Sequence, residues 1–126
     1  MLSYILLLAG AAAAAFWGVM HLAKTRPALS VFEPLTDDNR YVLRMEWIVE
    51  GVALVFVAVL VAVVTVIQGP GTAGSRLVYG MSVGFLITMS LVSLFTGARA
   101  SPLPYKLCAP IFASAAALIG LGGFLT

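Results

Sequence analysis

The residues that could do chemistry in this chain are few, and the most informative is one carboxylate. Glu46 and Glu50 are four residues apart, a spacing that places two side chains on the same face of a helix. Two acids on one face repel each other unless a proton, a cation or a basic side chain lies between them. Glu50 is therefore the candidate catalytic acid or base, or the polar anchor, of a site.

Other polar residues are expected at the same level as this carboxylate pair. Two arginines, one lysine (Lys106) and one histidine are available partners, and a serine adds a hydroxyl from the third apolar segment. We predict a ligand-binding set of Glu46, Glu50, Arg44, Arg99, His21 and Ser93. The alternative is a structural charge cluster at the helix ends, with Glu50 bonded to Arg99 or to a serine hydroxyl.

A metal centre is considered and not predicted. His21 with Glu46 and Glu50 could bind a divalent cation, but such sites in helical bundles usually contain a Glu-x-x-His pair, which is absent. His21 is instead expected to be an interfacial residue. Cys108 is the one cysteine of the chain, which rules out an internal disulfide, and we expect it to behave as a small hydrophobe. No nucleotide-binding motif is present, and the sequence names no cofactor.

The elements that must position these residues are four apolar stretches. Of the 126 residues, 62% are hydrophobic and only 10% are charged, with a mean hydropathy of +1.09. A soluble domain carries about 25% charged residues, so lipid is the expected solvent and a nucleic-acid binder is excluded. The stretches cover residues 2–20, 47–67, 77–96 and 107–125, each long enough to cross a hydrocarbon core of about 30 Å. We predict an all-α, integral membrane, antiparallel four-helix bundle that forms a single domain over residues 1–126.

The basic residues predict the orientation of this bundle. Six of the seven lie in or beside the first and third loops, and one lies in the second: Lys24, Arg26, Arg40, Arg44, Arg99 and Lys106 against Arg76. Cytoplasmic loops carry the excess of Lys and Arg. We therefore expect a cell-membrane protein, in the inner membrane, with loops one and three cytoplasmic and both termini outside.

The depth of Glu50 in the membrane can be estimated from the length of the uncharged run that follows it. The uncharged run behind it, residues 51–67, is about 25 Å long as a helix. Glu50 should lie about one turn inside the hydrocarbon boundary, where an acid needs a companion or must be neutral.

Small residues predict the helix-packing faces, because they let backbones approach closely in lipid. The expected stripes are Gly10, Ala14 and Gly18; Ser82, Ser90, Ser93 and Gly97; and Ala109, Ala113, Ala116 or Ala117, and Gly120. Thr36 is expected to cap the second long helix, with Asp37 and Asp38 in its first turn. Five aromatic residues are expected to be membrane-interface anchors: Trp17, Trp47, Tyr41, Tyr79 and Tyr105. The segment 29–35 is either a connector or a cap over the cytoplasmic opening.

The stretch Arg44-Met-Glu-Trp-Ile-Val-Glu-Gly-Val-Ala-Leu-Val-Phe56 resembles the second helix of the DoxX-like small membrane proteins, with Glu50 and Gly51 at the matching position. The closing Pro-Ile-Phe-Ala-Ser-Ala-Ala-Ala-Leu118 is similar to the last helix of that family. The resemblance implies a four-helix bundle that serves as an accessory or quinone-proximal membrane subunit.

The four-span layout, with Arg44 upstream of Glu50, is also similar to the MAPEG family of membrane glutathione transferases. The His and Asn that normally lie between these two positions in that family are replaced here by Met45 and Trp47. This departure counts against glutathione chemistry.

Three functions stay open at this point. The first is an accessory or binding subunit for a lipid-soluble ligand, a quinone or lipid, or for a partner enzyme. The second is a membrane enzyme acting on a lipophilic substrate, with Glu50 as acid or base and Arg99 or Arg44 holding an anionic group. The third is an oligomeric pore or proton-coupled transporter. Membrane lipids and a homo-oligomer or partner membrane protein are the expected partners; nucleic acid is not.

Overall fold

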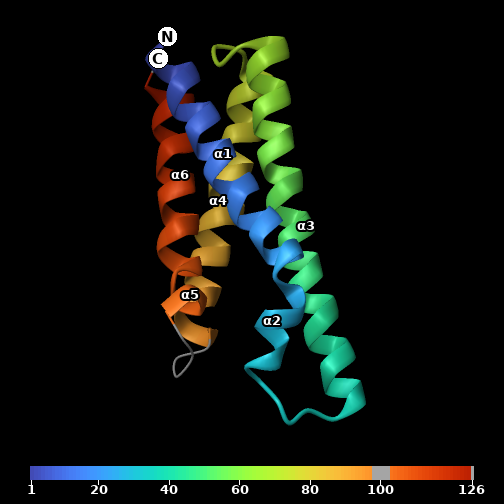
Figure 1. Cartoon of the computed structure of the whole chain (residues 1–126). Coiled ribbons are helices and arrows are strands. Elements are labelled where there is room, and N and C mark those ends of the chain that lie inside the picture. The colour runs from blue at the N-terminus through green and yellow to red at the C-terminus, as the bar shows by residue number, and fades with distance from the viewer. Residues whose placement is uncertain (98–102, 126) are drawn as a thin grey trace.

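The computed structural model describes residues 1–97 and 103–125, and this part of the chain is helical with no strand. This confirms the predicted all-helical class. The helices are α1 (Leu2–Ala23), α2 (Thr25–Ser30), α3 (Asp37–Gln68), α4 (Ala73–Thr96), α5 (Leu103–Lys106) and α6 (Cys108–Phe124) (Figure 1).

Three of the described helices, α1, α3 and α4, are long and apolar enough to cross a membrane. They contain the expected spans 2–20, 47–67 and 77–96. The fourth expected span, 107–125, corresponds to α6, an apolar helix of 17 residues that is shorter than the other three.

Helices α1, α3, α4 and α6, referred to below as the four long helices, pack side by side, and consecutive ones run in opposite directions (Figure 1). Helix α1 packs mainly on α3 and α6, and α4 packs mainly on α6. Both termini lie at one end of the molecule, and α2 and α5 lie at the other. This arrangement brings the end of α1, the first half of α3 and the start of α6 together.

Helix α3 starts where the sequence predicts it. Thr36 is extended, and its hydroxyl accepts a hydrogen bond from the backbone N–H of Asn39, at 3.3 Å. Asp37 and Asp38 occupy the first turn, where the positive end of the helix dipole favours acidic side chains. Helix α3 therefore begins well before its apolar part. Its first turns, which precede the expected span 47–67, carry charged residues.

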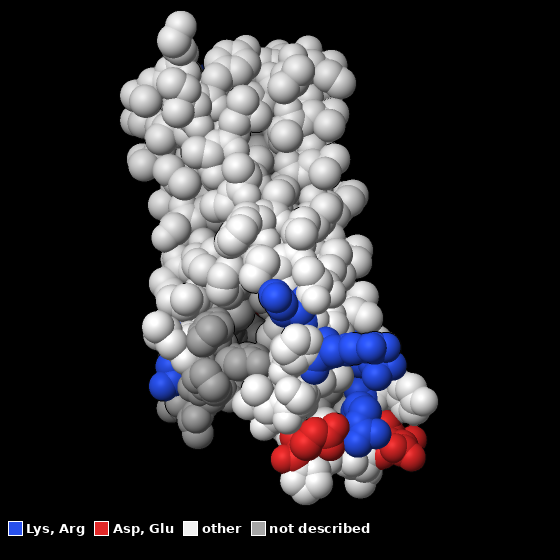
Figure 2. All heavy atoms as spheres, viewed as in Figure 1, with Lys and Arg blue, Asp and Glu red and all other residues white. Residues whose placement is uncertain are grey.

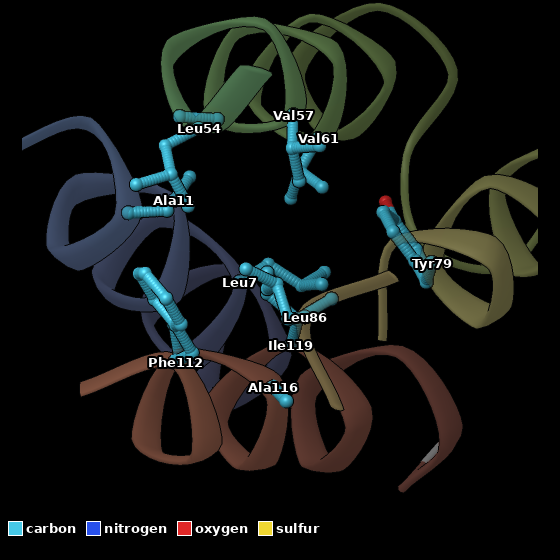
Figure 3. Close-up of a cluster of buried hydrophobic side chains, with 13 residues drawn as sticks. Leu7, Ala11, Leu54, Val57, Val61, Tyr79, Leu86, Phe112, Ala116 and Ile119 are labelled. Atoms are coloured by element: carbon cyan, nitrogen blue, oxygen red, sulfur yellow. The ribbon is translucent and has the colours of Figure 1, made fainter. Parts of the chain in front are cut away.

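The core lies along the common axis of the four long helices. Figure 3 shows side chains from each of them pointing toward one centre, among them Leu7 from α1, Leu54 from α3, Leu86 from α4 and Phe112 from α6. These four side chains are fully buried. In lipid, which is as apolar as such a core, helices are held together by close packing rather than by water exclusion.

Glycines on α1 make its close contacts possible. A Cβ at Gly18 would lie 2.8 Å from the carbonyl oxygen of Gly51 on α3, and one at Gly10 would lie 2.7 Å from Ile119 on α6. The predicted stripe of small residues on α1 therefore packs on both neighbours, with Ala14 also buried.

The prediction for the packing face of α6 was wrong in part. Ala113 is exposed, and the buried face consists of Phe112, Ala115, Ala116, Ile119, Gly122 and Gly123. The small residues of α6 occur on every side of the helix, so their spacing alone does not identify its buried face.

Tyr79 is also not the interfacial anchor that the sequence suggested. Its side chain is fully buried, and its hydroxyl lies 2.9 Å from the hydroxyl of Thr65 on α3. Thr65 in turn donates to the carbonyl of Val61, at 2.6 Å. The tyrosine can be buried because this partner satisfies its polar atom.

Candidate functional site

The site is built around His21, in the last turn of α1, and Glu50, in the middle of α3. His21 Nε2 lies 3.5 Å from Glu50 Oε2, and the two side chains are 3% and 25% exposed. The close approach of Gly18 to Gly51 brings these helices together one turn away. Two residues of the predicted ligand-binding set thus lie beside each other, and His21 is the companion of the Glu50 carboxylate.

Two tryptophans hold the imidazole in place. The ring of Trp47 stacks on His21 with centroids 4.5 Å apart, and the edge of Trp17 approaches at 5.9 Å. Trp47 Nε1 donates a hydrogen bond to the backbone carbonyl of His21, at 2.7 Å. Trp17 and Trp47 were predicted to be interface anchors; in the structure they form the walls of the histidine site.

The hydrogen bond at Nδ1 determines how the imidazole presents its other nitrogen. His21 Nδ1 lies 3.1 Å from the carbonyl oxygen of Trp17. A carbonyl oxygen can only accept a hydrogen bond, so Nδ1 must carry a proton. Nε2 is buried and has no hydrogen-bond partner among the described residues, and Glu50 is the group that faces it.

Cys108, which the sequence did not select, completes the cluster. It is the first residue of α6, and its sulfur accepts a hydrogen bond from Trp17 Nε1, at 3.4 Å. The ligand atoms of His21, Glu50 and Cys108 all lie within 4.8 Å of one another. The positions of these residues in three different helices explain why no local spacing indicated the group.

A cavity of about 450 Å³ opens beside His21. Its walls are mainly apolar and aromatic, with Phe16, Trp17 and Trp47 as the aromatic members. Pro27 and Ala28 of α2 also line it, so the beginning of the first loop forms part of the wall. Lys24, His21 and Cys108 are the polar or ionisable residues of the lining.

The remaining predicted site residues lie elsewhere. Glu46 and Arg44 are exposed on α3, and the guanidinium of Arg44 lies 5.8 Å from the centre of the Tyr41 ring. Ser93 is half-buried on α4 and is not among the residues that line the cavity. Arg99 falls outside the described residues.

In the view of Figure 2, charged side chains gather at this end of the molecule, which is the end that carries α2. Arg40 makes ion pairs with Glu33, at 3.0 Å, and with Asp37, at 3.1 Å. The hydrogen bond from Arg40 holds the pKa of the Glu33 carboxyl below its ordinary value. The cavity thus opens at the end of the molecule where the charged side chains gather.

The comparisons with known proteins give no family for this chain: no protein-family model, no curated protein and no solved structure matches it.

Proposed function

We propose that this protein is an integral membrane four-helix bundle that binds a lipid-soluble molecule in the cavity beside His21, as a small binding or accessory subunit. The single observation that carries the proposal is the cavity itself. Its volume of about 450 Å³ lies within the range of small-molecule sites, about 300–1,000 Å³. An apolar wall with a few convergent polar groups is the usual composition of such a site.

The lining favours a planar, conjugated ligand with a carbonyl group, such as a quinone. Trp17, Trp47 and Phe16 offer aromatic surface for a ring. The ammonium of Lys24 can donate hydrogen bonds to a carbonyl oxygen. The apolar walls and the scarcity of polar groups favour binding over hydrolysis or group transfer.

The surface of the molecule supports a membrane location. Large apolar side chains point outward along the long helices, including Phe56, Val66, Ile67, Leu77 and Met81. Acyl chains would cover them at no cost, whereas water would not. The positive-inside asymmetry then assigns the cavity end to the cytoplasmic side, with α6 as the fourth span and both termini outside.

Tryptophan fluorescence provides a direct test, because the chain has two tryptophans and both line the cavity. The protein in lipid nanodiscs is titrated with a short-chain benzoquinone, which quenches indole emission on contact. We expect saturable quenching. Ala28→Leu, which adds volume to the cavity wall, should raise the Kd by about tenfold or more, or about 1.4 kcal/mol.

Ala12→Leu is the matched control, since it adds the same atoms at an exposed position of α1. It should leave the Kd unchanged. Quenching that is equally affected by both substitutions, or that rises linearly with quinone without saturation, would show partition into lipid and refute the binding site.

A further inference from the structure

We propose that His21, Glu50 and Cys108 form a binding site for one Zn²⁺ ion or a transition-metal ion of similar ligand preference. This inference goes beyond the proposed function, and it does not require that a quinone binds. The three ligand atoms come from α1, α3 and α6 and already lie within 4.8 Å of one another.

The histidine is arranged as a metal ligand. Its Nδ1–H is held by the carbonyl oxygen of Trp17, at 3.1 Å, and this leaves Nε2 directed at the cluster. Histidines that bind metals almost always donate the other ring N–H to a carbonyl or carboxylate in this way, which fixes the tautomer and the ring orientation. The stacked ring of Trp47 further restricts rotation of the imidazole.

The environment of the buried His21 Nε2 atom favours a bound cation. It is without a hydrogen-bond partner among the described residues, in a side chain that is only 3% exposed. Its nearest charged neighbour is Glu50 Oε2, at 3.5 Å. A lone pair facing a carboxylate is repulsive, so either a proton or a metal ion must lie between the two atoms.

The sulfur favours the metal ion over a simple proton bridge. Cys108 Sγ accepts a hydrogen bond from Trp17 Nε1, at 3.4 Å, and lies within 4.8 Å of the ligand atoms of His21 and Glu50. Sulfur is a preferred ligand of Zn²⁺. A histidine–glutamate ion pair needs no third ligand. A thiolate, a carboxylate and a neutral imidazole together carry two negative charges, which one divalent cation neutralises in a medium of low dielectric constant.

The geometry requires only small movements. Zn²⁺ bonds of about 2.0–2.3 Å place tetrahedral ligand atoms about 3.3–3.8 Å apart. Rotation of the Glu50 side chain, which is partly exposed, can shorten the present separations. Three protein ligands leave a fourth position, as in zinc sites that accept water or another molecule. His21 and Cys108 also line the cavity, so that position is adjacent to it.

Metal titration of the full-length protein tests the site. The purified protein is stripped with a chelator and titrated with Co²⁺, which occupies zinc sites and reports its ligands by absorption. We expect one Co²⁺ per chain, visible bands of tetrahedral intensity and a thiolate-to-metal band in the near ultraviolet. Zn²⁺ should displace the Co²⁺ and remove these bands.

Three ligand variants and one control variant separate the ligands from their surroundings. Cys108→Ser should abolish the thiolate band, and His21→Gln should weaken binding by at least tenfold. Glu50→Gln should weaken it similarly, whereas Glu46→Gln, one turn away on the exposed surface of α3, should leave it unchanged. Circular dichroism and gel filtration of each variant verify that the helices and the particle size are retained.

Several outcomes would overturn the proposal. One is a wild-type protein that binds no Co²⁺ or Zn²⁺ at micromolar concentration, which would leave a proton between His21 and Glu50. Bound Co²⁺ without a thiolate band, or equal weakening by Glu46→Gln and Glu50→Gln, would place the metal elsewhere. Quinone quenching measured on the metal-free protein stands apart from all of these results, so failure of one proposal can be told from failure of the other.

Discussion

The residue pair Tyr79–Thr65 shows how single polar groups are managed inside this bundle. Both side chains are fully buried, and their hydroxyls lie 2.9 Å apart between α4 and α3. Because Thr65 donates to Val61, Tyr79 must be the donor to Thr65. Removing the tyrosine hydroxyl therefore deletes one buried hydrogen bond and leaves Thr65 still bonded.

We expect Tyr79→Phe to lower the free energy of unfolding by about 1 kcal/mol, the usual contribution of such a bond. Equilibrium unfolding in mixed detergent micelles measures the change. Tyr41→Phe is the control: Tyr41 is exposed, and its ring still faces Arg44 after the change. Equal effects of the two substitutions would mean that the buried bond contributes nothing.

A second residue-scale prediction concerns pH. The hydrogen bond from Arg40 lowers the pKa of Glu33 in the folded protein. A lowered pKa means that the pair stabilises the loop above the unfolded pKa of about 4.3, and that this contribution disappears as the pH falls through the folded pKa. Both side chains are exposed, so salt should weaken the effect.

Carbon-13 NMR of the Glu33 carboxyl measures this titration. Arg40→Gln should return the pKa of Glu33 toward its ordinary value. Arg26→Gln, which removes an exposed charge from α2, should not. An unchanged titration in Arg40→Gln would show that the ion pair does not persist in solution.

At the scale of helices, the contact between α1 and α3 controls the site. A Cβ at Gly18 would meet the backbone oxygen of Gly51 at 2.8 Å and Val55 at 2.9 Å. Backbone atoms cannot turn aside as a side chain can, so the helices must separate. His21, about one turn further along α1, would move away from Glu50 at the same time.

Gly18→Ala should therefore destabilise the protein by about 1–3 kcal/mol and also weaken ligand and metal binding. Gly84→Ala in α4 is the control, because nothing lies within 4 Å of its added Cβ. That change should be neutral or should stabilise the helix by up to about 1 kcal/mol. Equilibrium unfolding of both variants in micelles measures the change in the free energy of unfolding. No change in Gly18→Ala would contradict the close packing of α1 on α3.

At the scale of the whole molecule, charge and apolarity are separated along the bundle. Lys, Arg, Asp and Glu gather at the end that carries α2 and the cavity (Figure 2). Large apolar side chains are exposed along α1, α3 and α4. The positive-inside rule predicts that the charged end lies on the cytoplasmic side of the membrane.

Cysteine labelling tests this orientation. In a Cys108→Ala background, Asp38→Cys and Gly71→Cys place single thiols at opposite ends of α3, both at exposed positions. A membrane-impermeant maleimide added to sealed vesicles of known orientation should label position 38 only from the cytoplasmic face and position 71 only from the other. Labelling of both from one face would refute the proposed spans.

Several features of this protein could be predicted from the sequence, because they depend on local properties of the chain. An apolar run marks the region of a membrane-length helix, and so the regions of α1, α3, α4 and α6 were predictable, although α3 extends beyond its apolar run. The cap at Thr36 depends on residues within one turn of it. The proximity of His21 and Glu50 could be predicted because both were expected at the same end of the bundle, where a carboxylate needs a polar partner.

The packing face of α1 was predicted from its small residues, but the tertiary structure decided which sides of the other helices face inward. It buried Tyr79, turned Ala113 outward and brought Cys108 to His21 beside a cavity. In a soluble protein, the polar face of a helix reveals its rotation about its own axis. Here the neighbouring helices and the expected lipid are equally apolar, so the rotation of each helix depends on its packing against residues distant in the sequence.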